Sequence, residues 1–313
     1  MTLKGGKFSS GQKLKARELQ RYGSGMLVGV TTENPAHLST PLSLSSIQVD
    51  ITTRLGAPMP LTPTGLKALD FMLGGGLRPG TLLSLSGPPG SGRTALALLI
   101  AYMAARTRAG VVVASVGLDE TEVVARLAAR AVNREYPSAR LTYASIWNGE
   151  AFAHDETRRA VNAAVEAVHQ KVGGFLHLSR LTPDGSLRHL GERLGAFWAR
   201  HERLVLVLDD IETAVAGMEG DLDARVLDAA ALLRSLADRG AAVVCTSLDR
   251  HGDLVAPSAT ACAKIVRTAP AGGGDWGAEL VMTKNRVGPV GAMPLHLAAG
   301  TMQLSEGSSI DVR

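Results

Sequence analysis

Cysteine is nearly absent from this sequence: Cys245 and Cys262 are the two among 313 residues. Two cysteines cannot form a disulfide framework, which excludes the small disulfide-stapled secreted class. Aromatic residues make up 4 % of the chain, so the core has to be built from aliphatic side chains. The longest apolar run within an expected helix, 95–105, is too short to cross a bilayer, and the N-terminus lacks an apolar signal-peptide core. We therefore expect a cytoplasmic protein with no membrane partner.

Positive charge is concentrated at the N-terminus. Residues 1–21 contain six Lys and Arg residues against Glu18, a net charge of +5, whereas the whole chain carries +4. Such a segment suits nucleic acid or an acidic partner, and it is equally typical of a solvated chain end. Residues 31–60 are rich in Thr, Ser and Pro, with one short strand expected near 44–51. The sequence thus predicts a basic tail and linker over 1–60 and a folded domain over 61–313.

From residue 61 onward, short apolar runs alternate with longer segments of helical periodicity. Wholly apolar strands that alternate with helices are typical of an α/β fold whose parallel sheet is buried on both faces. The last strands are closely spaced and joined by Gly-rich turns, which predicts an antiparallel edge. Strands are expected near 82–86, 111–115, 175–178, 204–208, 241–246, 263–267, 278–284 and 294–298. Helices are expected near 64–73, 92–107, 120–133, 155–172, 184–201 and 222–239.

The most specific motif is a glycine-rich segment between the first of these strands and the helix after it. It matches the phosphate-binding pattern G-x-x-x-x-G-K-[ST], except that arginine replaces lysine. Its residues are Gly87, Pro88, Pro89, Gly90, Ser91, Gly92, Arg93 and Thr94. The glycines let backbone N–H groups surround phosphates, the helix N-terminus adds about half a positive charge, and the threonine supplies a hydroxyl for Mg²⁺. The arginine keeps the charge of lysine but is bulkier, so we expect ATP binding to be retained better than ATP hydrolysis.

A second signal is the apolar strand at 204–208, which is followed directly by Asp209 and Asp210. A carboxylate that ends a buried strand lies at the edge of the sheet where open α/β folds bind ligands. We expect Asp209 to hold Mg²⁺ opposite Thr94. Several strand–helix units separate these two residues, an order that fits the RecA-type branch of phosphate-loop proteins.

Three further segments resemble the RecA-like ATPase domain of DnaB-type replicative helicases and, more distantly, the RadA and KaiC proteins. They are TGLKALD with LGGGLRPG over 64–80, the stretch 231–250, and KNRVGPVG over 284–291. The resemblance covers about 61–305. It implies a P-loop NTPase that uses ATP and Mg²⁺, assembles with itself into a ring, most often a hexamer, or a filament, and acts on single-stranded DNA. It also implies that Lys284 and Arg286 reach the γ-phosphate of the neighbouring protomer and form the catalytic set together with Arg93 and Asp209.

Two positions depart from the family pattern around the γ-phosphate. Gly117 stands where the family has its catalytic glutamate, which leaves Glu120 or Asp119 as the alternative base. Ser247 stands where the family has the glutamine that senses the γ-phosphate. Together with Arg93, these departures predict weakened hydrolysis.

The expected DNA-facing segments are not basic either. The stretch after Asp210, a DNA-facing loop in the family, is acidic, whereas phosphate contacts need basic residues. The second such loop would hold Arg250 and His251. Two functions therefore stay open: a ring-forming ATPase motor that acts on DNA, and a catalytically impaired, nucleotide-dependent scaffold that recruits partners. A recombination- or clock-type RecA relative is a third alternative, based on the GPPGSG loop.

Overall fold

The computed structural model describes residues 52–53, 55–136, 141–184, 186–270, 275–307 and 311–312. The chain divides into two compact units, Met1–Pro58 and Met59–Arg313, and every element discussed below belongs to the second. The strand expected near 44–51 lies outside the described residues. None of the helices within the described ranges is both long and apolar enough to span a membrane.

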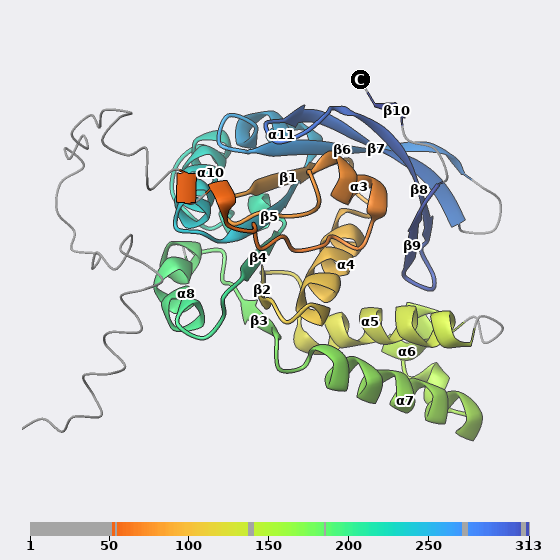
Figure 1. The fold of residues 1–313 in the computed structure, drawn as a ribbon. Helices are drawn as coiled ribbons and strands as arrows, with labels where there is room; N and C mark the ends of the chain where they lie inside the picture. The colour runs from red at the N-terminus through yellow and green to blue at the C-terminus, as the bar shows by residue number, and fades with distance from the viewer. Residues whose placement is uncertain are drawn as a thin grey trace, which may run out of the picture. The chain divides into compact units, whose positions relative to one another are not determined.

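A ten-stranded sheet, counted over the described residues, forms the centre of the second unit (Figure 1). Its order is β10-β8-β7-β6-β1-β5-β4-β2-β3, and β9 pairs with β8. The pairs from β6 to β3 are parallel, whereas β6 to β10 pair antiparallel, so the expected parallel sheet with an antiparallel C-terminal edge is confirmed. The strands are β1 (Leu82–Ser86), β2 (Gly110–Ser115), β3 (Leu176–Arg180), β4 (Leu204–Asp209), β5 (Ala242–Ser247), β6 (Ala261–Pro270), β7 (Asp275–Asn285), β8 (Gly291–Ala298), β9 (Gln303–Glu306) and β10 (Asp311–Val312).

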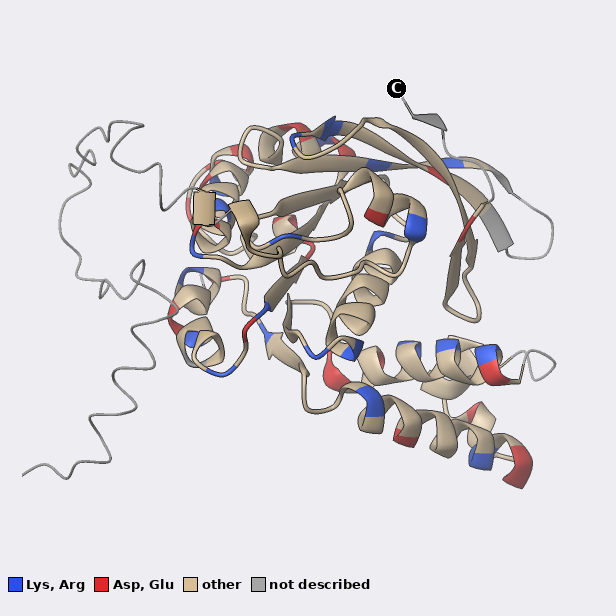
Figure 2. Cartoon of the chain, viewed as in Figure 1, with Lys and Arg blue, Asp and Glu red and all other residues tan. Residues whose placement is uncertain are grey.

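Helices cover both faces of this sheet. They are α3 (Lys67–Met72), α4 (Arg93–Arg106), α5 (Glu120–Glu135), α6 (Tyr143–Trp147), α7 (Asp155–Val172), α8 (Leu190–Trp198), α9 (Ile211–Ala214), α10 (Leu222–Asp238) and α11 (Asp249–Val255), with the 3-10 turns η2 (Glu150–Phe152) and η3 (Ser186–His189). Figure 2 shows that the charged residues lie largely on the helices, while the strands at the centre of the sheet carry few of them.

The central strands alternate between two aliphatic cores, one on each face of the sheet. Val111 and Val207 pack with α3 and α4 on one face, whereas Val112 and Leu206 pack with α8 and α10 on the other. Every residue of β2, β4 and β5 is buried, which explains why these strands read as continuous apolar runs rather than alternating ones. Because these strands are packed on both faces, their ends, which carry the candidate site, are held in place.

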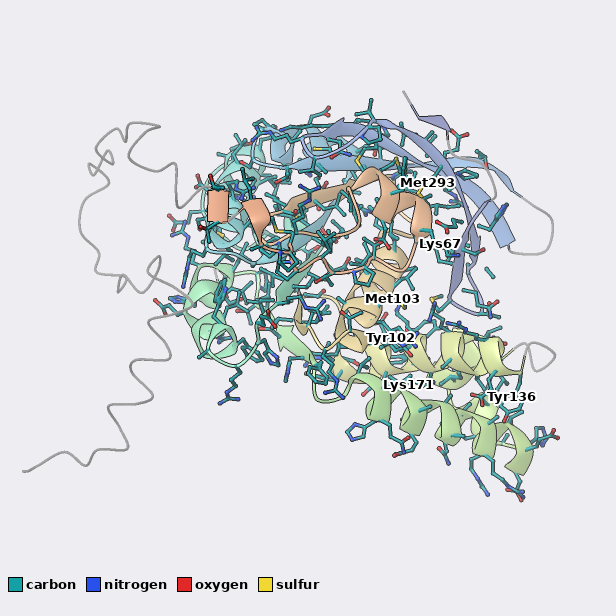
Figure 3. All side chains as sticks on the ribbon, in the orientation of Figure 1. Lys67, Tyr102, Met103, Tyr136, Lys171 and Met293 are labelled. Atoms are coloured by element: carbon teal, nitrogen blue, oxygen red, sulfur yellow. The ribbon has the colours of Figure 1, made fainter. Side chains whose placement is uncertain are left out.

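A separate lobe is formed by α5, α6 and α7 (Figure 1). Its small core contains Ala128, Val132, Ile146 and Val161. Figure 3 shows Tyr102 where α4 meets this lobe, and Tyr136 at the outer end of α5. The lobe therefore has its own packing and reaches away from the sheet.

Two expected helices differ from the structure, and three short helices were not expected. The helix expected over 64–73 begins at Lys67. The Thr64 N–H and hydroxyl both donate to Asp70 Oδ1, at 2.8 and 2.7 Å, and these bonds keep the residues before Lys67 outside the helix. The helix expected over 184–201 is divided into η3 and α8. The short helices α6, α9 and α11 were not predicted, because with five, four and seven residues they are too short to show helical periodicity.

Candidate nucleotide-binding site

The glycine-rich loop connects the end of β1 to the first turn of α4. Gly90 and Gly92 have φ angles of 71° and 87°, in the left-handed region that favours glycine. A Cβ at Gly87 would lie 2.5 Å from Ser91 Oγ, so no side chain fits there without displacing the serine. The Ser91 N–H donates to Pro88 O at 3.1 Å and closes a tight turn. The loop is thus compact and lies directly before the positive end of the α4 dipole.

The two expected Mg²⁺ ligands meet at this loop. Thr94 Oγ1 lies 3.1 Å from both carboxylate oxygens of Asp209, and Thr246 Oγ1 donates to Asp209 Oδ1 at 2.9 Å. The Asp209 side chain is buried at the end of β4. Burial raises its pKa, although the hydrogen bonds from Thr246 and Thr94 act in the opposite direction. A nearby cation would stabilise the charged form of such a buried carboxylate.

Unpaired polar atoms surround this pair. Ser91 Oγ, Arg93 Nη1 and Ser247 Oγ are buried and have no hydrogen-bond partner among the described residues. The charge of nearby Arg93 contributes a downward shift to the pKa of both Asp209 and Asp210, although burial keeps the pKa of Asp209 raised overall. Leaving a buried polar group unpaired costs about 1–3 kcal/mol, and an anionic ligand would remove that cost for the guanidinium and the hydroxyls.

These residues fit a phosphate ligand with Mg²⁺. A hydroxyl and a carboxylate are hard oxygen ligands of the kind that Mg²⁺ prefers, with phosphate oxygens and water as the remainder. Within the described ranges no group of three or more His, Cys, Asp and Glu residues is placed to hold a metal by itself.

The structure does not bring the two alternative bases to this pair. The Asp119 carboxylate caps α5 by accepting from the Glu122 N–H at 2.7 Å, and its other oxygen lies 4.0 Å from Arg180 Nη2. Glu120 is exposed on the first turn of α5. No hydrogen bond or ion pair between described residues joins either one to Thr94 or Asp209. Gly117 has open space around its Cβ position, so the place of the family glutamate is unfilled by any side chain.

A buried ionisable pair beside the site was missed at the sequence level. Glu212 Oε1 accepts from the Leu248 N–H at 2.7 Å and lies 2.7 Å from His251 Nδ1, and both side chains are buried. Burial raises the pKa of Glu212, with a further upward contribution from Asp210. The pair joins α9 to α11, the helices that follow the neighbouring strands β4 and β5. The sequence signal for this pair is an acidic residue, Glu212, and a histidine, His251, each placed shortly after the end of one of two neighbouring strands.

This pair corrects the expected DNA-facing loops. His251 is fully buried within α11, so the prediction that it lies on a DNA-facing loop is wrong. Arg250 is exposed on the same helix. The acidic stretch after Asp210 begins with the helix α9, whose Ile211 and Glu212 are buried, so its first residues are not free to face DNA either.

Lys284 and Arg286 are placed differently from each other. Lys284 belongs to β7, and its Nζ donates to Ala256 O at 2.5 Å within the same chain. Arg286 begins the β7–β8 connection, is exposed, and its side chain makes no hydrogen bond or ion pair with a described residue. The Asn285 amide between them donates to Met72 O at 2.7 Å, which fastens the connection to the end of α3. The turn expected to carry both cations therefore presents Arg286 alone.

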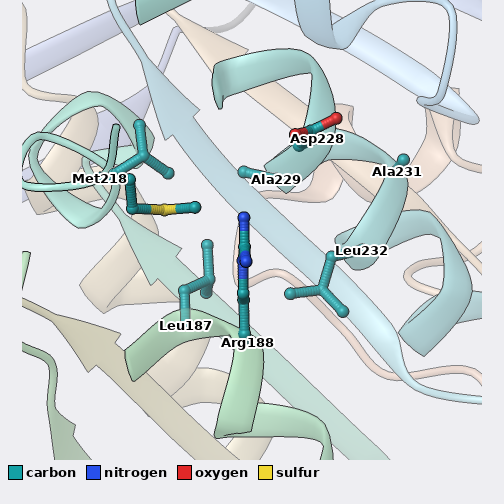
Figure 4. Close-up of a pocket in the computed structure, with 8 residues that line it drawn as sticks. Leu187, Arg188, Met218, Asp228, Ala229, Ala231 and Leu232 are labelled. Carbon is teal, nitrogen blue, oxygen red and sulfur yellow. The ribbon is translucent and has the colours of Figure 1, made fainter. Parts of the chain in front are cut away.

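A groove of about 300 Å³ lies away from the loop, between η3 and α10 (Figure 4). Most of its wall is apolar, and Arg188 and Asp228 add one charge of each sign. Its lining residues are Leu187, Arg188, Val215, Met218, Asp228, Ala229, Ala231 and Leu232. None of them belongs to the glycine-rich loop.

Comparison with known proteins places this chain in a family. The sequence model of the DnaB-like helicase C-terminal domain matches residues 62–172. The DNA repair and recombination protein RadB of Halobacterium salinarum is 32 % identical in an alignment of 162 residues that covers 49 % of this chain and 69 % of RadB. The chain belongs to the RecA-like family that includes RadB. Proteins of this RecA-like ATPase family generally use a nucleotide with Mg²⁺.

Solved structures show the same fold at low sequence identity. A DnaB-like replicative helicase, described together with its interactions with primase, has a TM-score of 0.68 at 13 % identity over 94 % of this chain and 70 % of its own. The flagellar accessory protein FlaH from Methanocaldococcus jannaschii has a TM-score of 0.53 at 18 % identity, and the comparison covers 80 % of this chain and all of that one. The RecA-like fold of the chain is therefore shared with a helicase and with a flagellar accessory protein.

Proposed function

We propose that this RecA-like domain binds Mg·ATP at Gly87–Thr94, assembles into a ring or filament, and acts on single-stranded DNA as a motor with weakened hydrolysis. The observation that carries the proposal is the pairing of Thr94 Oγ1 with both oxygens of Asp209 at 3.1 Å. This pairing joins the first turn of α4 to the end of β4, at the edge of the sheet where the glycine-rich loop lies. The DnaB-like helicase and RadB relatives support the motor assignment.

The roles of the residues follow from their chemistry. The backbone N–H groups of 87–94 and the N-terminus of α4 would hold the phosphates, and the unpaired Arg93 Nη1 would donate to one of their oxygens. Thr94 and Asp209 would hold Mg²⁺, which when bound neutralises charge on the phosphate oxygens. Arg286 would reach the γ-phosphate bound by the next protomer, because its side chain is exposed and engages no described residue of its own chain. Lys284 would join it only after releasing Ala256 O.

Weakened hydrolysis is part of the proposal. Gly117 supplies no carboxylate to activate water, and Asp119 is already engaged by the α5 cap. Ser247 is too short to reach far beyond the end of β5. Removing one transition-state stabiliser commonly costs about 10²–10³ in rate, so these departures around a single phosphate predict slow turnover.

The second candidate function is a nucleotide-dependent scaffold. It is favoured by the same departures and by the burial of His251 and Glu212, which removes these residues from any DNA-facing surface. In this function nucleotide binding would control assembly or partner recruitment without repeated hydrolysis. A hexameric ring, a cytoplasmic location, and the division into a 1–60 tail and linker and a 61–313 ATPase domain are common to both candidates.

ATP turnover with and without single-stranded DNA separates the two. For the motor we expect turnover slower than about 10 per second, the middle of the range for ordinary enzymes, with stimulation by single-stranded DNA. An Asp209→Asn variant is the control, because any turnover that survives this change belongs to a contaminant. Retained nucleotide binding without turnover under either condition would contradict the motor and support the scaffold.

A further inference from the structure

Four arginines gather where the end of α4 meets α5. Arg126, Arg130 and Arg134 follow one another at intervals of four residues, which places them along one stripe of α5 about 6 Å apart. Arg106 ends α4. The charge view shows Lys and Arg recurring along α5 beside the end of α4 (Figure 2). These four residues are called the arginine face below.

Two guanidiniums of this face converge on one buried ring. Arg130 Cζ lies 5.6 Å from the ring centre of Tyr102, and Arg106 Cζ lies 6.0 Å from the same centre. Arg126 forms an ion pair with Glu122 at 2.6 Å, whereas none of the ion pairs among the described residues involves Arg106, Arg130 or Arg134. Burial lowers the pKa of Arg130, and the positive charges of Arg134 and Arg106 lower it further. Like charges that converge without a carboxylate repel one another, and a bound anion would relieve that repulsion.

Aromatic rings lie beside the Arg126 end of the cationic stripe. The Arg126 guanidinium lies 4.6 Å from the ring centre of Tyr143, whose ring is 6.1 Å from that of Trp147. Trp147 is 42 % exposed, although its ring is large enough to be buried in a core. Exposed rings beside arginines offer stacking surfaces for bases as well as contacts for phosphates.

We propose that the arginine face, with Tyr143 and Trp147 beside Arg126, binds the phosphodiester backbone and bases of single-stranded nucleic acid. The aromatic rings favour this ligand over an acidic protein segment, which would need the charges but not the rings. The face runs along α4: Arg126 and Arg130 line one small pocket with Ala95, Leu98 and Leu99, and Arg106 lies at the end of the helix, about 20 Å from the glycine-rich loop. It would guide a strand along the outside of the domain, apart from the DNA-facing segments that follow β4 and β5. The inference does not depend on ATP binding.

The test is fluorescence anisotropy of the full chain with a labelled oligothymidine, in the absence of nucleotide and over a range of salt. Arg106→Gln with Arg134→Gln removes two exposed charges without disturbing the core. We expect Kd to rise about tenfold or more and the slope of log Kd against log salt to fall by about 1.4, at ~0.7 per phosphate contact on a single strand. Arg106→Lys with Arg134→Lys keeps the charges and should stay within about threefold of the wild type.

Matched controls decide the outcome. Arg158→Gln with Arg193→Gln removes the same charge from exposed positions on α7 and α8 and should leave Kd unchanged. Thermal melting checks that each variant is folded, and DNA-free ATP turnover of the Arg106→Gln/Arg134→Gln variant should equal that of the wild type, which separates this inference from the proposed function. Oligothymidine affinity and salt slope equal to those of the wild type would overturn the proposal. Loss of self-association in light scattering with unchanged oligothymidine binding would also overturn it, and would assign the face to a second copy of the chain.

Discussion

Replacing Arg286 by alanine should lower ATP turnover by about 10³-fold or more while leaving the fold intact. An arginine supplied in trans contributes about 10³–10⁵ in phosphoryl transfer, because it stabilises charge on the γ-phosphate in the transition state. The side chain is exposed and pairs with no described residue of its own chain, so its removal should not affect stability. Steady-state ATP turnover measures the effect, and Arg193→Ala, an exposed arginine on α8, is the matched control.

Mixing two inactive variants shows whether Arg286 acts across an interface. Arg286→Ala retains an intact nucleotide site, whereas Asp209→Asn retains an intact arginine. In a head-to-tail ring each site meets the arginine of its neighbour, so random equal mixing should restore about one quarter of wild-type turnover. No recovery on mixing, or an Arg286→Ala variant as active as the wild type, would contradict a shared site.

Arg93→Lys combined with Gly117→Glu should raise turnover by about 10²-fold. The first change replaces a bulky guanidinium by the compact ammonium of the usual phosphate loop. The second adds a carboxylate to activate water, and no atom lies within 4 Å of the Cβ position of Gly117 to oppose it. A gain of this size equals the contribution expected of one or two transition-state stabilisers. Single-turnover kinetics with Mg·ATP separates the gain in chemistry from changes in binding.

The matched control for this variant is Arg93→Lys with Gly117→Gln. Glutamine has nearly the same size as glutamate but cannot accept the proton of the attacking water. The gain should therefore disappear with glutamine while nucleotide affinity stays the same. If the wild type already turns over at about 10 per second, or if glutamine accelerates as well as glutamate, impairment at these positions is wrong.

The sheet could be predicted because its strands are buried on both faces. β2, β4 and β5 contain apolar residues almost throughout, and such runs between helices have few other interpretations. The short helices α9 and α11 could not be predicted, because four and seven residues carry no periodicity and their positions follow from tertiary contacts such as Glu212 with His251. The local sequence pattern is thus sufficient to predict the strands of the sheet, whereas the short helices that connect them depend on tertiary packing.

The candidate site divides in the same way. The Thr94–Asp209 pair could be predicted, because one residue follows a phosphate-loop pattern and the other ends a strand that lies near it in the sheet. The different environments of Lys284 and Arg286 could not, since the length of β7 is set by its pairing with β6 and β8. Strand β7 continues to Asn285, one residue beyond Lys284. The Lys284 side chain therefore lies within the strand and donates to Ala256 O, whereas Arg286 follows the end of the strand and is exposed.

Isothermal titration with Mg·ATP and Mg·ADP tests the central claim, that Gly87–Thr94 with Asp209 is a nucleotide site. The account predicts a Kd tighter than about 100 μM, equivalent to roughly −5.5 kcal/mol, for both nucleotides. Asp209→Asn should weaken the Mg-dependent part of this affinity, and chelation of Mg²⁺ should weaken the binding of the wild type in the same way. A folded wild-type protein that gives no binding heat with either nucleotide at about 100 μM would contradict the account.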